Sequence, residues 1–186
     1  MMMNTFRNLI AVAIFLGAMH TSASAQQFMS RNAAISFFSS TPVEDISAES
    51  DQCSAVLDVA DSRLAFQVPI LSFHFEKALM EEHFNENYME SEQYPAATFQ
   101  GTIEGLNPDG AEGQVQQVVA DGQLTIHGVS VDRRVEGTAS RSGDGWVLHA
   151  TFAVPTADHK IAIPKLVREK IAEAIEVTLD ATLLPR

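Results

Sequence analysis

Residues 146–154 read Trp-Val-Leu-His-Ala-Thr-Phe-Ala-Val, and every second side chain, from Trp146 to Val154, is apolar. Successive side chains of a β-strand point to opposite faces, so this stretch presents one continuous apolar face and is expected to bury it. Residues 175–183 repeat the pattern, with Ile, Val, Leu, Ala and Leu alternating against Glu, Thr, Asp and Thr. Both stretches predict antiparallel strands with one face toward a core.

Other parts of the chain show the same period of two. Clean alternation recurs in residues 64–70 and 97–103, and weaker candidates lie at 33–38, 54–59, 114–120, 124–129 and 131–140. Turn-forming residues separate many of these runs, at Asn107-Pro108-Asp109-Gly110, Asp121-Gly122 and Gly143-Asp144-Gly145. About eight to ten short strands joined by turns predict an all-β meander that closes into a barrel or folds into a sandwich.

One segment departs from this period. In residues 76–88 the apolar side chains Leu79, Met80, Phe84 and Tyr88 recur at helical spacing, and acidic and amide side chains fill the other face. We expect a short amphipathic helix that lies across one end of the barrel as a lid. A second helical turn is expected in residues 165–173, after Pro164.

The first 25 residues have the order of a cleavable secretion signal. Arg7 precedes an apolar run over residues 9–19, and Ala23-Ser24-Ala25 forms a cleavage site of small residues before Gln26. The run is shorter than the ~20 apolar residues that span a bilayer. We therefore expect a signal peptide in residues 1–25, one domain in residues 26–186, a periplasmic or secreted location and no stable membrane insertion.

Charge and cysteine content exclude several classes. The chain has 12 basic and 24 acidic residues, a formal net charge of −12, which argues against nucleic acid and anionic lipid surfaces as partners. Cys53 is the only cysteine, so no internal disulfide can form, and its register with Ala55 and Leu57 predicts a buried apolar residue.

No motif for catalysis or metal binding stands out. The sequence lacks a nucleophile elbow, a zinc-helix motif and a phosphate-binding glycine loop, so no enzyme activity is predicted. His127 and His149 alternate with apolar residues and are expected to be solvated strand histidines. His83 shares a helix with Met80, a pair that could hold copper, but methionine at this spacing is more often core, and we predict no metal site and no cofactor.

Aromatic residues exceed what turns and surface require, with 11 Phe in the chain. Most of them fall on or beside the inward faces of the strands. The interior of an eight-stranded barrel is either filled by side chains or wide enough for one small ligand. Alternation identifies the inward residues but leaves both interiors open.

Three blocks in order resemble the YceI-like family of exported bacterial proteins. They are Tyr94-Pro95-Ala96-Ala97-Thr98-Phe99, residues 122–129 with the sequence Gly-Gln-Leu-Thr-Ile-His-Gly-Val, and Phe152-Ala153-Val154 followed by Asp158 and Ile161. The resemblance covers residues 33–184. The chain departs from the family pattern at three places. Residues 35–40 replace the Trp-x-x-Asp-x-x-His opening that is common in the family, and His159 stands where an aromatic residue is usual. The segment 79–91 resembles a feature of a subgroup.

The resemblance implies a lipocalin-like antiparallel β-barrel of about eight strands whose apolar interior holds a polyisoprenoid lipid or an isoprenoid quinone, without catalysis. Such a lipid would be the only bound group and the main partner, and a homodimer is left open. The alternative is a solid-core barrel that acts as a stress-related protein-interaction module. The expected ligand-binding residues are Phe37, Phe66, Val68, Phe73, Phe75, Leu79, Met80, Phe84, Tyr88, Phe99, Leu124, Ile126 and Phe152.

Overall fold

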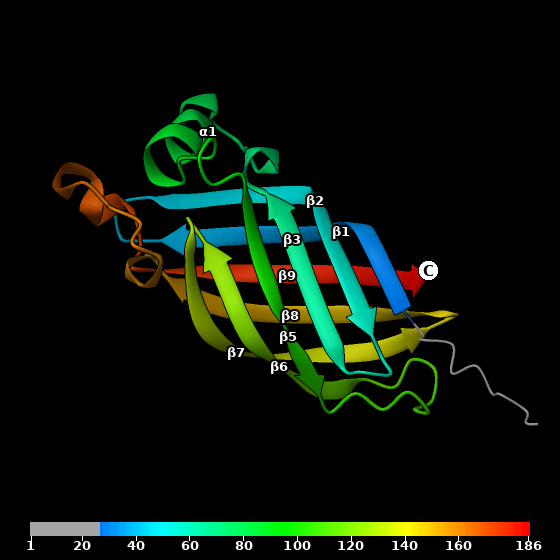
Figure 1. Cartoon of the computed structure of the whole chain (residues 1–186). Helices are drawn as coiled ribbons and strands as arrows, with labels where there is room; N and C mark the ends of the chain where they lie inside the picture. Colours follow the sequence, from blue (N-terminus) through cyan, green and yellow to red (C-terminus); the bar gives the residue numbers. More distant parts are fainter. Residues whose placement is uncertain (1–26) are drawn as a thin grey trace, which may run out of the picture.

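A computed structural model describes residues 27–186, and the expected signal peptide lies outside the described residues. Within this range the chain forms nine strands, one α-helix and several short helical turns (Figure 1). The strands are β1 (Gln27–Ser40), β2 (Asp45–Asp58), β3 (Arg63–Pro69), β4 (His74–Phe75), β5 (Ala96–Glu104), β6 (Gln116–Ile126), β7 (Val129–Ser142), β8 (Gly145–Pro155) and β9 (Ala174–Pro185). The helical elements are η1 (Ile70–Ser72), α1 (Ala78–His83), η2 (Phe84–Tyr88), η3 (Thr156–His159) and η4 (Lys165–Lys170).

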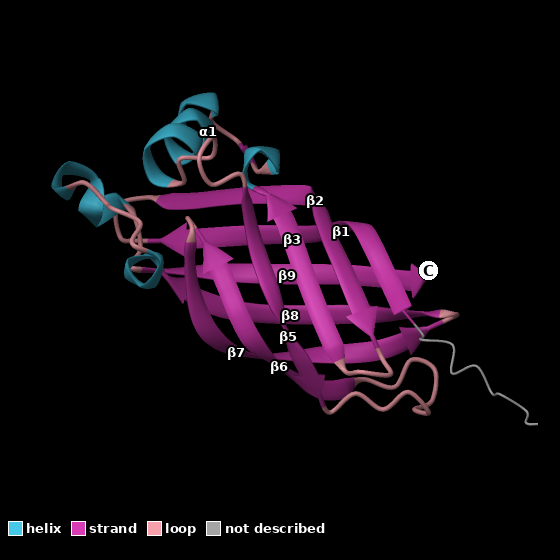
Figure 2. Ribbon diagram, in the orientation of Figure 1, coloured by secondary structure: helices cyan, strands magenta, loops and turns pink. Residues whose placement is uncertain are grey.

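Eight of these strands close into a barrel. The order is β1-β9-β8-β7-β6-β5-β3-β2, every pairing is antiparallel, and β1 also pairs with β2, which joins the two ends of the sheet. The two-residue strand β4 adds to β2 at one end. Figure 2 shows the strands forming one continuous wall, with the helical elements gathered at one end. The predicted fold class is confirmed.

The predicted helical segments are present, with small differences. α1 begins at Ala78 rather than at residue 76 and continues into the π-helical turn η2, so the lid covers residues 78–88. The second segment is the 3₁₀ helix η4, which follows Pro164 and ends at Lys170. Both connect strands at the same end of the barrel (Figure 1).

One predicted turn is wrong. Asp121-Gly122 lies in the middle of β6, where Gly122 pairs with Gly101 of β5, so residues 116–126 form one strand instead of two. A Cβ atom at Gly122 would collide with the backbone carbonyl of Gln100, so the glycine serves the close approach of two strands. The chain reverses instead at His127-Gly128, where both residues have positive φ (51° and 70°), as a two-residue hairpin turn requires.

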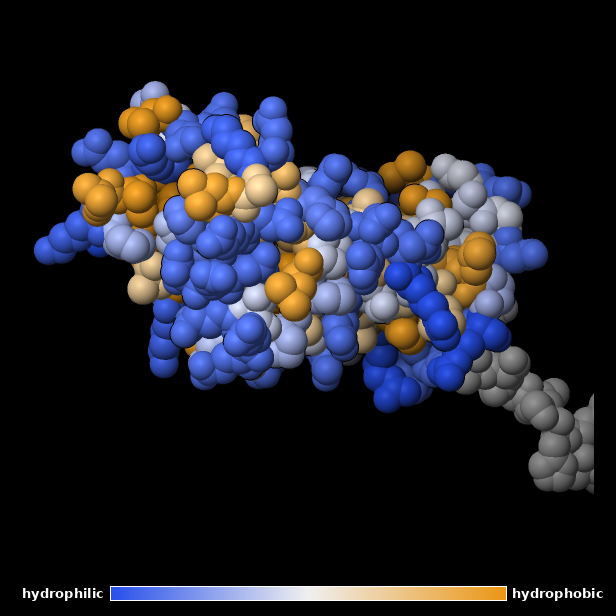
Figure 3. All heavy atoms as spheres, turned by 90° about the horizontal axis from the view of Figure 1, so that it is seen from above, coloured by the Kyte–Doolittle hydropathy of each residue, from blue (hydrophilic) through white to orange (hydrophobic). Residues whose placement is uncertain are grey.

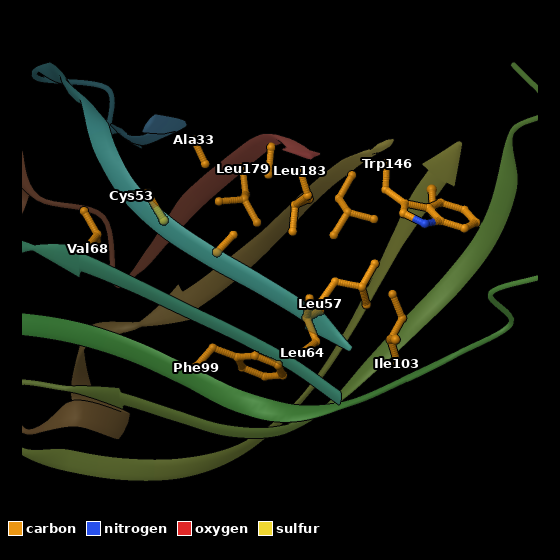
Figure 4. Close-up of a cluster of buried hydrophobic side chains, with 14 of the residues drawn as sticks. Ala33, Cys53, Leu57, Leu64, Val68, Phe99, Ile103, Trp146, Leu179 and Leu183 are labelled. Atoms are coloured by element: carbon orange, nitrogen blue, oxygen red, sulfur yellow. The ribbon is translucent and has the colours of Figure 1, made fainter. Parts of the chain in front are cut away.

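The end of the barrel opposite the lid is filled. Leu57 and Leu183 are fully buried there, and the Trp146 ring packs edge-on against Phe28 with 6.5 Å between centroids. Figure 4 shows Trp146, Leu57 and Ile103 together, away from Val68 and Cys53 along the barrel. Outside this plug the guanidinium carbon of Arg141 lies 6.0 Å from the centre of the Trp146 ring. Packed side chains therefore close the barrel at this end.

Candidate functional site

Above the plug the barrel encloses a cavity of about 640 Å³. Leu64, Ile103, Val118 and Leu148 belong both to the buried core and to the lining of the cavity. The volume falls within the ~300–1,000 Å³ of typical ligand sites. The interior is thus filled at one end and hollow at the other, which contradicts the solid-core alternative.

All thirteen residues expected to bind a ligand lie on the cavity wall. They come from β1, β3, β5, β6 and β8, from the turn around β4, and from the lid. The strand residues among them were expected to point inward from alternation, and the lid residues were expected to do so from helical spacing. The sequence reasoning missed the lining residues of the segment that follows η3, which are Ile161, Ile163, Val167 and Ile171.

Four phenylalanines form a cluster at the mouth of the cavity. The ring of Phe84, on the lid, lies 5.4 Å from Phe37, 5.8 Å from Phe73 and 5.1 Å from Phe75, measured between centroids. Phe37 belongs to β1 and Phe75 to β4, so the cluster joins the lid to the barrel wall. Aromatic contacts of this kind contribute about 0.5–1.5 kcal/mol each beyond the area that they bury.

The lid presents a different apolar face from the one expected. Leu79 touches the cavity rim but is 61% exposed, so it contributes less to docking than the spacing predicted. Met89, directly after η2, is 6% exposed and lines the cavity instead. The π-helical turn widens the helix by one residue at this point, which shifts the inward face toward Met89. Figure 3 shows apolar atoms at the end of the molecule that carries α1, and also along the barrel and at its opposite end.

Among the described residues, the carboxylate and ammonium side chains that line the cavity are Glu44, Lys77 and Lys170. A carboxylate oxygen of Glu44 lies 3.4 Å from the Nζ of Lys77, and its other oxygen lies 3.6 Å from the Nζ of Lys170. The two ammonium groups therefore share one carboxylate. Together the three side chains give the rim a net positive charge of one unit at this position. Lys77 belongs to the lid side of the mouth and Lys170 to η4, so Glu44 bridges the two sides.

His127 is not the solvated strand histidine that its position in the sequence predicted. It lies in the β6–β7 turn with its side chain 13% exposed, and its Nε2 lies 2.7 Å from a carboxylate oxygen of Glu90. Its ring also packs against Tyr94 at 4.5 Å between centroids. Glu90 lies two residues after the end of the lid, so His127 fastens the lid's C-terminal end to the barrel. His149 agrees with the prediction, being half-exposed on β8 beside Asp180.

His159, the residue that departs from the family pattern, is fully buried. Its Nδ1 donates a hydrogen bond to the carbonyl of Val129 at 3.0 Å, which ties η3 to the start of β7. The other ring nitrogen is buried without a hydrogen-bond partner among the described residues. His159 does not line the cavity, so its role is to hold the segment beside the mouth in place.

Cys53 lies on the cavity wall and is 1% exposed. Burial in apolar surroundings raises the pKa of its thiol to about 11, although a backbone hydrogen bond at Gln67 partly opposes this shift. The thiol is therefore protonated and acts as a small apolar surface, as the sequence predicted.

Within residues 27–186 no three His, Cys, Asp or Glu side chains come together in a way that could hold a metal ion. In the same range no helix has the length and apolar character needed to cross a membrane.

Comparisons with known proteins agree with this architecture. A polyisoprenoid-binding domain from Saccharophagus degradans, implicated in plant cell wall breakdown, has a TM-score of 0.76 and 15% identity, covering 87% of this chain and 99% of that one. BcnA of Burkholderia cenocepacia gives 0.67 and 15% (81% and 95% covered), and a YceI protein of Campylobacter jejuni gives 0.56 and 19% (75% and 84% covered). No curated protein sequence matches the chain. The model of the YceI-like domain matches residues 19–183, and the chain therefore belongs to the YceI-like family.

Proposed function

We propose that this protein binds one long apolar lipid, a polyisoprenoid or an isoprenoid quinone, in the hollow half of its barrel. The observation that carries the proposal is the cavity of about 640 Å³, whose walls are mostly apolar. Each buried methylene group contributes ~0.8 kcal/mol, so a tail of about ten of them offsets much of the cost of association. The similarity to a polyisoprenoid-binding domain supports the same class of ligand.

The tail enters the barrel and the head stays at the mouth in this proposal. The plug around Trp146 closes the far end, so a ligand has one entrance, between the lid and η4. Lys77 and Lys170 can donate hydrogen bonds to a phosphate or to a quinone oxygen at this entrance. A phosphate head would compete with Glu44 for both ammonium groups and would make binding sensitive to salt, whereas a quinone head would not.

We further propose that the protein is an exported, non-catalytic carrier. The thiol of Cys53, which lines the cavity, is kept protonated by burial. The signal-like residues 1–25 support export. The intact mass of the exported protein tests this point, because a chain that retains residues 1–25 would contradict the proposed cleavage.

A blocked cavity tests lipid binding directly. Ala150 lines the cavity from β8, whereas Ala153 on the same strand points outward and is exposed. Ala150→Trp should fill the space and remove the lipid that mass spectrometry detects in gently purified protein, without loss of melting temperature. Ala153→Trp, the matched control, should keep the lipid. If both variants carry as much lipid as the wild type, the ligand does not sit in the barrel.

A further inference from the structure

Residues 160–171 form a segment with two unlike faces at the cavity mouth. Its inner side chains, among them Ile163, Val167 and Ile171, line the cavity. Leu166 does not line it and is 94% exposed, the highest value among the large apolar side chains of the described range. Figure 1 shows η4 protruding from the barrel at the end that carries the lid. A leucine held this far into solvent beside a lipid entrance has no structural role inside the domain.

The same segment concentrates positive charge on an acidic protein. It carries Lys160, Lys165, Arg168 and Lys170 against the single acid Glu169, although the whole chain has a net charge of −12. Within residues 27–186, no carboxylate pairs with the first three of these cations. The overall charge predicts repulsion from anionic lipid, but the local charge of this segment has the opposite sign.

We propose that residues 165–168 dock the cavity mouth on the anionic surface of a lipid bilayer. Leu166 enters the interfacial region while Lys165 and Arg168 contact the lipid phosphates, the combination that holds peripheral elements on membranes. The proposal builds on the proposed lipid ligand, because a water-insoluble lipid has to enter from a membrane. A mouth that faces the bilayer spares the tail a passage through water.

The charge of the lid fixes the orientation of this docking. Glu82 and Glu86 are exposed on the opposite side of the mouth and would be repelled by an anionic surface. The η4 side therefore approaches the bilayer and the lid faces away from it. This arrangement leaves the lid free to move while the segment 160–171 remains on the membrane.

Vesicle sedimentation tests the docking surface. The probes are phosphatidylcholine vesicles with and without phosphatidylglycerol. We expect wild-type protein to sediment with the anionic vesicles, and Lys165→Gln with Arg168→Gln to weaken this binding about fivefold for each cation removed. Leu166→Asp should abolish it. Val115→Asp is the matched control, because Val115 is 64% exposed in the loop at the far end of the barrel. This variant should bind the vesicles as the wild type does.

A second readout separates this proposal from the ligand itself. Vesicles loaded with a long-chain polyprenol should deliver it more slowly to Leu166→Asp than to the wild type, while both proteins hold the same amount at equilibrium. If the wild type takes up polyprenol but does not sediment, or if the two η4 variants sediment as well as it does, the docking surface is wrong and lipid binding stands. Sedimentation that depends on Leu166, without uptake of polyprenol, supports the docking surface and contradicts the polyprenol as ligand.

Discussion

Phe84→Ala probes how the lid is held. The Phe84 ring contacts three other phenylalanines at 5.1–5.8 Å between centroids, and it is half-buried. A fully buried phenylalanine costs ~3–5 kcal/mol when truncated to alanine, and three aromatic contacts account for a large part of that figure. For the half-buried ring we expect a loss of about 2–3 kcal/mol.

This loss should fall on the lid and not on the barrel. Residues 78–88 form a helical segment far too short to persist alone, so without the Phe84 anchor the lid detaches locally. Hydrogen exchange of the amides in residues 78–90 should accelerate about 30- to 150-fold, while those of β8 and β9 keep their rates. Bound lipid should also be released faster from this variant.

Leu79→Ala is the control on the same helix. Leu79 is 61% exposed and should change stability by no more than ~0.5 kcal/mol, with little change in exchange. If Phe84→Ala accelerates exchange in β8 and β9 as much as in the lid, the ring is ordinary core and the lid is not a separate unit. Unchanged lid exchange would equally refute the reasoning.

Cys53 should resist iodoacetamide in the native protein at pH values where the unfolded chain reacts. Because burial raises the pKa of the Cys53 thiol, the stabilisation that the thiol contributes should decline as pH rises above the thiol's pKa in the unfolded chain. Urea titrations at several pH values can follow this decline. The hydrogen bond from Gln27, with help from the Asp61 amide, lowers the pKa of Asp58. The Asp58 carboxylate therefore stabilises the fold above the pKa that it has in the unfolded chain, and this stabilisation is lost as pH falls. Asp58→Asn should flatten the acid side of the curve of stability against pH. Gly122→Ala should lower stability by about 1–3 kcal/mol in thermal melts, because the new Cβ would collide with the Gln100 carbonyl. In Gly143→Ala the new Cβ meets no atom, so the only loss of stability should come from the strain of a positive φ in alanine.

The predictable part of this fold is the part that depends on alternation. Phe66, Phe99 and Phe152 were placed inward from period alone, and all three lie on the cavity wall. The turn at Asp121-Gly122 was wrong because the same dipeptide suits a hairpin and a close strand contact, and only the partner strand with Gly101 distinguishes them. His127 was misplaced because the strand expected over residues 124–129 ends at Ile126, three residues earlier, so that His127 falls in the turn.

The hollow interior could not be predicted because alternation gives direction but not depth. Trp146 and Phe152 share one face of β8, yet Trp146 fills the plug and Phe152 borders empty space. What decides the difference is how many large side chains the other strands send to the same level of the barrel. This number depends on the register of every strand pair, and strand registers cannot be predicted from alternation alone.

The strand β8 shows how the two halves of the barrel divide stability and binding. At its start Trp146 is 2% exposed and packs against Phe28, so truncating it would cost the empty protein stability. Further along, Ala150 and Phe152 line the cavity and are only half-buried, so they lack the packing partners that a filled core would give them. A bound lipid would supply those partners, and it would raise the melting temperature by stabilising the folded state alone. Because Ala150 is small, the cavity keeps its width at that level. A single larger side chain at this position should therefore prevent lipid binding and stabilise the empty barrel by filling the space.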